Sequence, residues 1–279
     1  MDLLLALKAI LLGIVEGLTE FLPISSTGHL IVVEDLIRFR PGSRPAFLVA
    51  IQSGAILAVC WEYRARLLQL ARGLAGDAGE RRLALNIAIA FVPAAIAGVL
   101  FKKTIDTVLF FPLPVATALV LGGLVILWVE RRHATRDYHP RVNSIEEMSA
   151  LDAFKIGCAQ CFSLVPGTSR SGATIIGGLI FGFSRTAATQ FSFFLAIPTV
   201  IGAAVYSLYK ARDQLQTADA PLFALGFAAA FLAGLLCVRW LLRYVASHDF
   251  VLFAWYRIVF GAVILLTAYA GVVDWSEAG

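Results

Sequence analysis

Charged residues are scarce in this sequence. Asp, Glu, Lys and Arg make up 15% of the 279 residues, whereas a soluble domain carries about a quarter. Hydrophobic residues make up 59%, and the mean hydropathy is +0.81. This composition, with apolar runs of membrane-spanning length, argues against a soluble domain and predicts an integral membrane protein. At about 20 residues per span, the chain has room for six long helices and several shorter pieces.

Metal-binding and redox patterns are also sparse. The four cysteines all lie in apolar segments, which suits buried free thiols. Cys158 and Cys161 form a CxxC, but no second pair of ligands accompanies it. We therefore interpret the two cysteines as neighbours on one face of a helix, and not as a zinc or redox site.

The net charge of +4 and the pI near 9.0 raise the question of nucleic-acid binding. The basic residues, however, sit in short loops between apolar runs. This distribution is typical of the positive-inside rule for membrane proteins. We expect no nucleic acid among the partners of this protein.

The apolar segments define the expected helices. They cover residues 3–22, 29–37, 46–61, 84–101, 112–129, 153–165, 172–183, 187–209, 221–238 and 250–273. Five of them are long enough to cross a bilayer. Segments 29–37, 153–165 and 172–183 are too short, and each borders a break rich in Pro, Gly, Ser or Thr. The breaks are residues 22–29 and 166–172.

Irregular backbone survives at membrane depth only where protein or a water-filled cavity satisfies its polar groups. We therefore predict that 3–37 and 153–183 are two helix–break–helix units, each entering and leaving the membrane on the same side. A full crossing by the first segment stays open.

The two breaks resemble each other. Sliding the sequence along itself places Pro23 on Pro166 and Ser26 on Ser169. Paired interrupted segments in two halves indicate an inverted repeat with a site near the midplane. The predicted fold is an all-α polytopic membrane protein, an inverted-topology repeat with two re-entrant units. It forms one transmembrane domain, 1–279, with repeats at roughly 1–130 and 150–273.

Basic residues are unequally divided between the two ends of this bundle. If both units are re-entrant, loops 62–83, 130–152, 184–186 and 239–249 share one face. That face holds thirteen basic residues: Arg64, Arg66, Arg72, Arg81, Arg82, Arg131, Arg132, Arg136, Arg141, Lys155, Arg185, Arg239 and Arg243. The other holds seven: Arg38, Arg40, Arg44, Lys102, Lys103, Lys210 and Arg212. The excess predicts that the first face is cytoplasmic. The N-terminus and the acidic tail with Asp274 and Glu277 then lie outside.

Glu16 and Glu20 stand four residues apart in an otherwise apolar helix, so both carboxylates lie on one face. Ionisable groups inside a span face a cavity or a partner. A helix-packing role is the alternative, but two such groups directly before a polar break favour chemistry. A divalent cation, Mg²⁺ or Ca²⁺, shared by the two carboxylates would relieve their repulsion and neutralise phosphate charge.

The first break places three hydroxyls and an imidazole together, in Ser25, Ser26, Thr27 and His29. A hydroxyl attacks phosphorus if a base takes its proton, and His or Glu is the usual base. For any single hydroxyl, capping of the following helix is at least as good an interpretation. The cluster beside two acids favours catalysis.

The second break has the composition of an anion-binding site. The backbone of residues 167–172, which includes Gly167 and Gly172, precedes a helix N-terminus, where N–H groups bind anions. Arg170 adds a forked cation suited to phosphate oxygens. The alternative is a structural Arg–Glu bridge between the two repeats. Arg257, inside the last span, also needs a partner, and we expect backbone carbonyls or a loop acid in preference to catalysis.

Two long motifs, Glu16–His29 and Pro166–Thr174, closely resemble the signature motifs of the bacterial undecaprenyl-diphosphate phosphatases, the bacitracin-resistance family. The resemblance implies a phosphatase that converts undecaprenyl diphosphate to undecaprenyl phosphate for peptidoglycan synthesis. It implies an inverted-repeat fold in the bacterial inner membrane with the site facing the outer side. It also implies help from a divalent cation and a polyisoprenyl diphosphate lipid as substrate. A homodimer stays open.

Position by position, the resemblance assigns catalytic roles to Glu16, Glu20, Ser26, His29 and Arg170. It places Ser25, Thr27, Thr168, Ser169 and Ser171 around the phosphate. The type 2 phosphatidic acid phosphatases share a Ser-Gly-His-like element but require a His soon after Ser-Arg. Residues 171–176, which follow Ser169-Arg170 here, contain no His, so we reject that family.

As a hypothesis, Ser26 attacks the terminal phosphorus with His29 or Glu20 as proton acceptor, or an activated water attacks directly. A lipid flippase or transporter is the alternative function, because an inverted repeat alone suits it equally well.

Overall fold

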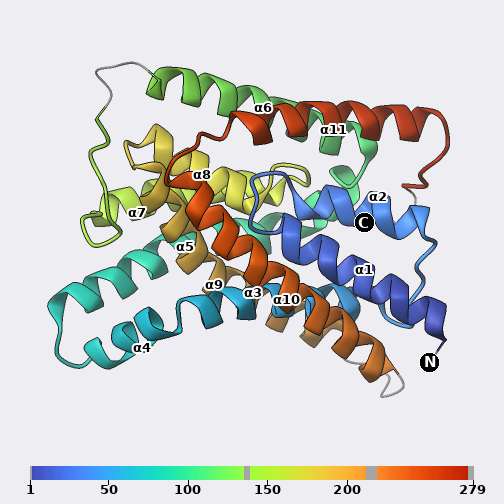
Figure 1. The fold of residues 1–279 in the computed structure, drawn as a ribbon, viewed down its shortest axis with the longest axis horizontal. Helices are drawn as coiled ribbons and strands as arrows, with labels where there is room; N and C mark the ends of the chain where they lie inside the picture. The colour runs from blue at the N-terminus through green and yellow to red at the C-terminus, as the bar shows by residue number, and fades with distance from the viewer. Residues whose placement is uncertain (1, 135–138, 212–218, 276–279) are drawn as a thin grey trace.

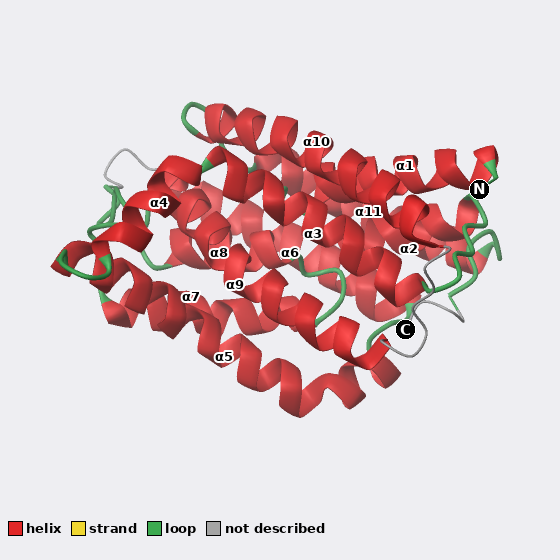
Figure 2. Ribbon diagram, turned by 90° about the horizontal axis from the view of Figure 1, so that it is seen from below, coloured by secondary structure: helices red, strands yellow, loops and turns green. Residues whose placement is uncertain are grey.

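A computed structural model of the chain describes residues 2–134, 139–211 and 219–275 (Figure 1). Over these residues the chain forms eleven α-helices and one 3-10 helix. The described part contains no strand (Figure 2), and its extended pairing is limited to an isolated bridge between Val142 and Phe183. Arg136, Arg212 and Glu277, which entered the charge argument above, lie outside the described residues.

Among the described residues, six helices are long and apolar enough to cross a membrane. They are α3 (Arg44–Glu62), α5 (Ala78–Val108), α6 (Pro112–His133), α9 (Arg185–Ala211), α10 (Ala220–Val245) and α11 (Val251–Tyr269). Leu100 and Leu236 on their outer faces are 71% and 68% exposed, as suits contact with lipid. The chain is therefore a polytopic, all-helical membrane protein. The expected count of five was one too low, because α3 extends beyond its apolar run to Arg44 and Glu62.

Four shorter helices flank the two breaks. The first break lies between α1 (Leu3–Thr19) and α2 (Ser26–Leu36), and the second lies between α7 (Ala150–Cys161) and α8 (Arg170–Ile180). A 3-10 turn, η1 (Phe162–Leu164), follows α7 directly. Both α2 and α8 have 11 residues. At about 1.5 Å per residue, each covers roughly half of the hydrocarbon thickness of a bilayer.

Both of these 11-residue helices begin with the same unusual cap. Ser25 and Ser169 have φ of 73° and 71°, a region that non-glycine residues rarely adopt. Their hydroxyls accept hydrogen bonds from the N–H groups of Gly28 and Gly172. The caps pair Ser25 with Ser169, whereas the sequence slide paired Ser26 with Ser169. The second break holds one additional residue, and Gly167 in it has φ of 95°.

The four loops expected on one face do meet at one end of the molecule, at the left of Figure 1. Arg66 forms an ion pair with Glu146 at 3.1 Å and so joins the first two loops. Glu130 forms an ion pair with Arg185 and accepts the N–H of Phe250 at 2.9 Å. The grouping of loops 62–83, 130–152, 184–186 and 239–249 is confirmed.

The stretch 62–83, expected as a loop, contains a further helix, α4 (Arg64–Gly73). Leu67 and Leu70, three residues apart on its surface, pack against the main hydrophobic core. Polar or basic residues interrupt the helix at four positions, Arg64, Arg66, Gln69 and Arg72, so the segment lacks the continuous apolar run that marked the other helices.

In each pair of short helices, the start of the first helix lies beside the end of the second. The N–H of Arg141, just before α7, donates to the carbonyl of Gly182, just after α8, at 2.7 Å. Its guanidinium contacts Asp152 at 2.6 Å. Burial alone would raise the pKa of Asp152, but hydrogen bonds from Arg141 and Ser149 lower that pKa to about 2. At the opposite end, Lys8 Nζ donates to the carbonyl of Arg38 at 3.3 Å and joins α1 to the end of α2.

Glycines let each pre-break helix approach a long helix of the other half. A Cβ on Gly17 of α1 would lie 2.5 Å from the carbonyl oxygen of Ala230 in α10. A Cβ on Gly157 of α7 would lie 2.6 Å from that of Ala90 in α5. Such close backbone contact is typical of helix packing in membranes. It buries Glu16, beside Gly17, in the middle of the bundle.

Candidate active site

The two breaks touch each other although they lie far apart in sequence. The hydroxyl of Ser171 donates to the carbonyl of Leu22 at 2.8 Å, and that of Ser169 lies 3.4 Å from the same oxygen. The two hydroxyls are 2.9 Å apart. This contact aligns the N-termini of α2 and α8 at a common point inside the bundle.

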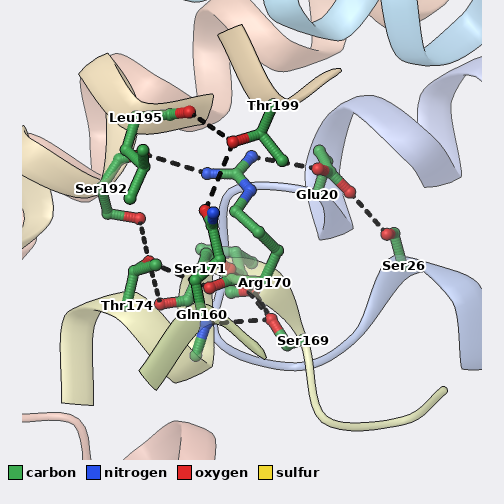
Figure 3. A network of polar contacts seen from close by, with 12 residues as sticks. Glu20, Ser26, Gln160, Ser169, Arg170, Ser171, Thr174, Ser192, Leu195 and Thr199 are labelled. Carbon is green, nitrogen blue, oxygen red and sulfur yellow. Dashed lines mark hydrogen bonds and ion pairs between the residues drawn. The ribbon is translucent and has the colours of Figure 1, made fainter. Parts of the chain in front are cut away.

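Glu20 occupies that point (Figure 3). One carboxylate oxygen accepts the hydroxyl of Ser26 at 2.6 Å, and the other accepts Nη2 of Arg170 at 3.0 Å. The side chains of Glu20 and Arg170 are 12% and 10% exposed. The structure thus brings together an acid, a hydroxyl and a guanidinium from the two motifs, and it contains the Arg–Glu bridge considered above.

Arg170 is also tied to α9. Its Nη1 donates to the carbonyl of Ser192 at 3.1 Å. The hydroxyl of Ser192 lies 2.6 Å from that of Thr174, which donates in turn to the carbonyl of Arg170 at 2.9 Å. The Nε of Arg170 is buried and has no hydrogen-bond partner among the described residues.

Glu16 is completely buried, and neither of its carboxylate oxygens has a hydrogen-bond partner in the described part of the chain. Glu20 and Arg170 are close enough to act on it electrostatically. A buried, unpaired carboxylate is costly, so this group is either protonated or neutralised by a cation. Two free oxygens suit a hard divalent cation. The described residues contain no cluster of three or more His, Cys, Asp or Glu with metal-binding geometry, so other ligands would be water or substrate oxygens.

His29 is engaged with α11 and does not contact Ser26 through any hydrogen bond between the described residues. Its Nδ1 lies 2.7 Å from the carbonyl of Ser25, and its Nε2 lies 2.6 Å from the hydroxyl of Tyr256. A carbonyl only accepts, so Nδ1 carries a proton. The ring stacks on Phe260 with centroids 4.1 Å apart. As a proton acceptor for Ser26, the geometry favours Glu20 over His29.

The other residues expected around a phosphate have mixed surroundings. Ser25 serves as a helix cap, which confirms the capping interpretation for this hydroxyl, and Ser169 caps α8 in the same way. The N–H of Gly172 donates to its cap. Thr27 is half-buried, and its side chain makes no hydrogen bond with the described residues. Thr168 is also half-buried, and its carbonyl, like that of Gly167, is used by Arg257.

Arg257 supplies five hydrogen bonds to backbone carbonyls. The acceptors are Pro23 in the first break, Gly167 and Thr168 in the second, and Ala118 and Leu119 in α6, at 2.8–3.2 Å. The side chain is 1% exposed. The expected pairing with carbonyls is confirmed. Its connection to both breaks could not be inferred from a lone charge in an apolar span.

Known proteins resemble this chain along most of its length. The family described as bacitracin resistance protein BacA matches residues 9–263. The chain belongs to the BacA family.

Three relatives illustrate the similarity within the BacA family. The undecaprenyl-diphosphatase of Janthinobacterium sp. (strain Marseille) is 57% identical over 277 residues, covering 99% of this chain and 100% of the relative. That of Herminiimonas arsenicoxydans is 58% identical over 277 residues, with the same coverage. That of Nitrosomonas europaea is 58% identical over 276 residues, covering 99% of both chains.

Sequence reasoning missed several residues that shape this BacA-family site. Ser192 and Tyr256 each lie in a long apolar helix, where a single hydroxyl is an ordinary packing residue. Thr174 lies inside the second motif, and its position there was the only available signal. The contacts of Ser192 and Tyr256 depend on how α9 and α11 pack, so no local pattern identifies them.

We expect Arg257→Lys to destabilise this BacA-family protein by about 3 kcal/mol or more, because one ammonium cannot reach five carbonyls around a planar fork. Gly122→Ala should act in the same direction, since its Cβ would lie 2.1 Å from Nη2 of Arg257. Thermal unfolding in detergent measures both effects. The matched control is Gly98→Ala in α5, whose Cβ would make an ordinary 3.5 Å contact and should change stability by less than about 1 kcal/mol. Equal effects of the two alanines would contradict this role of Arg257.

Proposed function

We propose that this protein is an undecaprenyl-diphosphate phosphatase and that the Glu20–Ser26–Arg170 cluster is its active site. It hydrolyses undecaprenyl diphosphate to undecaprenyl phosphate and inorganic phosphate, and so recycles the lipid carrier for peptidoglycan synthesis. The activity is supported by the names of relatives that match the chain along its full length. The site assignment is supported above all by one observation, that Glu20 accepts from Ser26 and from Arg170 at the contact of the two breaks.

The geometry supports Ser26 as nucleophile. Its O–H already points to Glu20 at 2.6 Å, so the proton passes to this carboxylate as Oγ attacks the terminal phosphorus. The bond from that phosphorus to the bridging oxygen breaks, and Glu20 gives the proton to the departing undecaprenyl phosphate. The regenerated carboxylate then deprotonates a water that attacks the phosphoserine, and this proton returns to Oγ of Ser26 as inorganic phosphate leaves. Direct attack by such a water is the variant pathway.

Arg170 has the chemistry to hold the phosphates. A planar guanidinium binds phosphate oxygens in a forked arrangement and neutralises the charge that builds on them during transfer. In the structure, Nη2 of Arg170 donates to the carboxylate of Glu20. When Ser26 transfers its proton to Glu20, the carboxyl loses its negative charge and releases its hold on Arg170. The guanidinium is then free to interact with the phosphoryl oxygens.

For this mechanism we expect Ser26→Ala, Glu20→Gln and Arg170→Lys each to reduce phosphate release by about 100-fold or more, the usual range for removing a catalytic group. The measurement is phosphate release from undecaprenyl diphosphate by purified protein in detergent. Ser43→Ala is the matched control, because Ser43 is also buried and directly precedes a helix, α3, but lies outside the Glu20–Ser26–Arg170 cluster. Its activity should equal that of the wild type.

The outcomes of this assay separate the alternatives. A pure lipid transporter releases no phosphate in detergent, where no second compartment exists. A phosphoserine trapped at Ser26 would support the covalent route, whereas near-complete activity of Ser26→Ala would exclude it.

We also propose that Glu16, with Glu20, holds a divalent cation. A bound Mg²⁺ or Ca²⁺ would supply charge neutralisation for the diphosphate. The two carboxylate oxygens of Glu16 without a partner fit this ligand. Chelation of divalent cations should lower phosphate release several-fold, and added Mg²⁺ or Ca²⁺ should restore it. Glu16→Gln should bind the cation more weakly and require a higher concentration for the same rate. Full activity after chelation would rule out the cation.

We further propose an inverted repeat of two re-entrant units in the bacterial inner membrane, with the site open to the outer side. The matching serine caps support the repeat. The contacts of Lys8 with Arg38 and of Arg141 with Gly182 support hairpins that return to the end at which they start. The greater number of basic residues at the Arg141 end supports a cytoplasmic location for that end.

Single cysteine substitutions, introduced into a variant that lacks the four native cysteines, test this topology. Lys103 and Gly76 are both exposed, at opposite ends of α5. An impermeant maleimide should label Lys103→Cys in intact cells and Gly76→Cys only after permeabilisation. Thr27→Cys, in the first break, should react from the outer side if the unit is re-entrant. Labelling of Thr27→Cys only from the inside would mean that α1 crosses the membrane.

A further inference from the structure

Gln160, in the last turn of α7, is completely buried and lies in the polar network of Figure 3. Its Oε1 lies 3.4 Å from the hydroxyl of Thr199. That hydroxyl has one proton, and the carbonyl of Leu195 takes it at 2.7 Å. The Thr199 oxygen therefore presents lone pairs to Gln160, and this orientation of the amide sets two acceptors against each other.

Two buried donors in the same place have no acceptor among the described residues, Nε2 of Gln160 and Nε of Arg170. Figure 3 shows the Gln160 amide pointing toward the Arg170 guanidinium. The contacts that both side chains make with α9 support this proximity. Arg170 Nη1 donates to the carbonyl of Ser192, and the carbonyls of a helix point toward its C-terminus. The guanidinium therefore lies about one turn before Thr199, the residue that Gln160 contacts. Nearly all buried donors in proteins are paired.

Rotating the amide by a half turn exchanges its Oε1 and Nε2, which have nearly the same shape. This exchange removes the clash of acceptors at Thr199 and gives partners to Nε2 of Gln160 and Nε of Arg170. Nε2–H then donates to the lone pair of Thr199, and Oε1 faces Nε–H of Arg170. We infer that Gln160 is a positioning residue that holds the Arg170 guanidinium through Nε. This inference rests on the proposed function, because Arg170 is the residue that binds the diphosphate there.

An amide suits this task better than an acid. The oxygen of Gln160 orients the guanidinium without cancelling its charge, which stays available to the phosphates. The register of the serine caps pairs Gln160 with Glu16 in the first half, and both are 0% exposed. One half therefore places an acid, and the other a neutral acceptor, before its break.

A double-mutant cycle tests the contact. Gln160→Met keeps the size of the side chain and removes the acceptor, and Arg170→Lys removes Nε–H. Gln160→Met alone should lower kcat/KM for phosphate release about 10-fold, the usual order for a hydrogen bond to a charged group. In the Arg170→Lys background it should lower it less than about 2-fold, because the bond is already absent. A purely structural role would give the same factor in both backgrounds and would overturn the inference.

The same cycle is read from thermal unfolding in detergent, which needs no activity. Gln160→Met should lower the Tm of the wild type by several degrees and that of Arg170→Lys by clearly less. The matched control is Asn86→Leu, which removes a buried amide bound to the carbonyl of Met148 near the loop end. Its effect on Tm should be the same in both backgrounds, and kcat/KM should stay unchanged.

The two proposals fail separately. If the wild-type protein releases no phosphate, the proposed function is wrong, and the Tm cycle still decides the contact between Gln160 and Arg170. If the wild type is active but the two residues act additively in both measurements, only the role of Gln160 is wrong.

Discussion

The buried guanidinium of Arg257 is the constraint on which the site depends. A broken helix leaves carbonyl groups without partners, and lipid has no water to satisfy them. Arg257 has five N–H donors, and each meets a carbonyl from one of the two breaks or from α6. The carbonyl dipoles compensate the charge of Arg257, and the charge compensates the carbonyls. One residue of α11 therefore satisfies backbone carbonyls in both breaks.

Once the breaks are fixed, their side chains can take on chemistry. Ser25 and Ser169, which have positive φ, turn the chain sharply just before α2 and α8 and cap these helices. Ser26 and Arg170, the residues directly after these caps, both reach Glu20. The two arginines divide the work, because Arg257 binds carbonyls and Arg170 binds an acid that can change its charge. Low dielectric around the cluster strengthens every one of these electrostatic contacts.

The site also contains donors and acceptors that the surrounding protein leaves free. Glu16 has two buried oxygens without a partner in the described chain, and the guanidinium of Arg170 and the carboxylate of Glu20 lie close enough to act on it electrostatically. Such a group destabilises the folded protein, and it persists where it serves to bind a charged ligand. A diphosphate that brings its own counterion fits this imbalance. The stability that the site gives up is supplied by packing, as at the glycine contacts between α1 and α10.

Hydropathy and the two motifs alone determined the class of this protein, the positions of most of its helices, and the choice of Glu20, Ser26 and Arg170 as candidate site residues, because each of these features is local in the chain. They missed α4, whose amphipathic surface has no apolar run, and the true register of the two breaks. The partners of His29, the part played by Ser192 and the clamp of Arg257 were decided only in three dimensions. Each depends on which faces of α9 and α11 turn inward, and a lone hydroxyl or guanidinium in an apolar helix carries no record of the carbonyl it will meet.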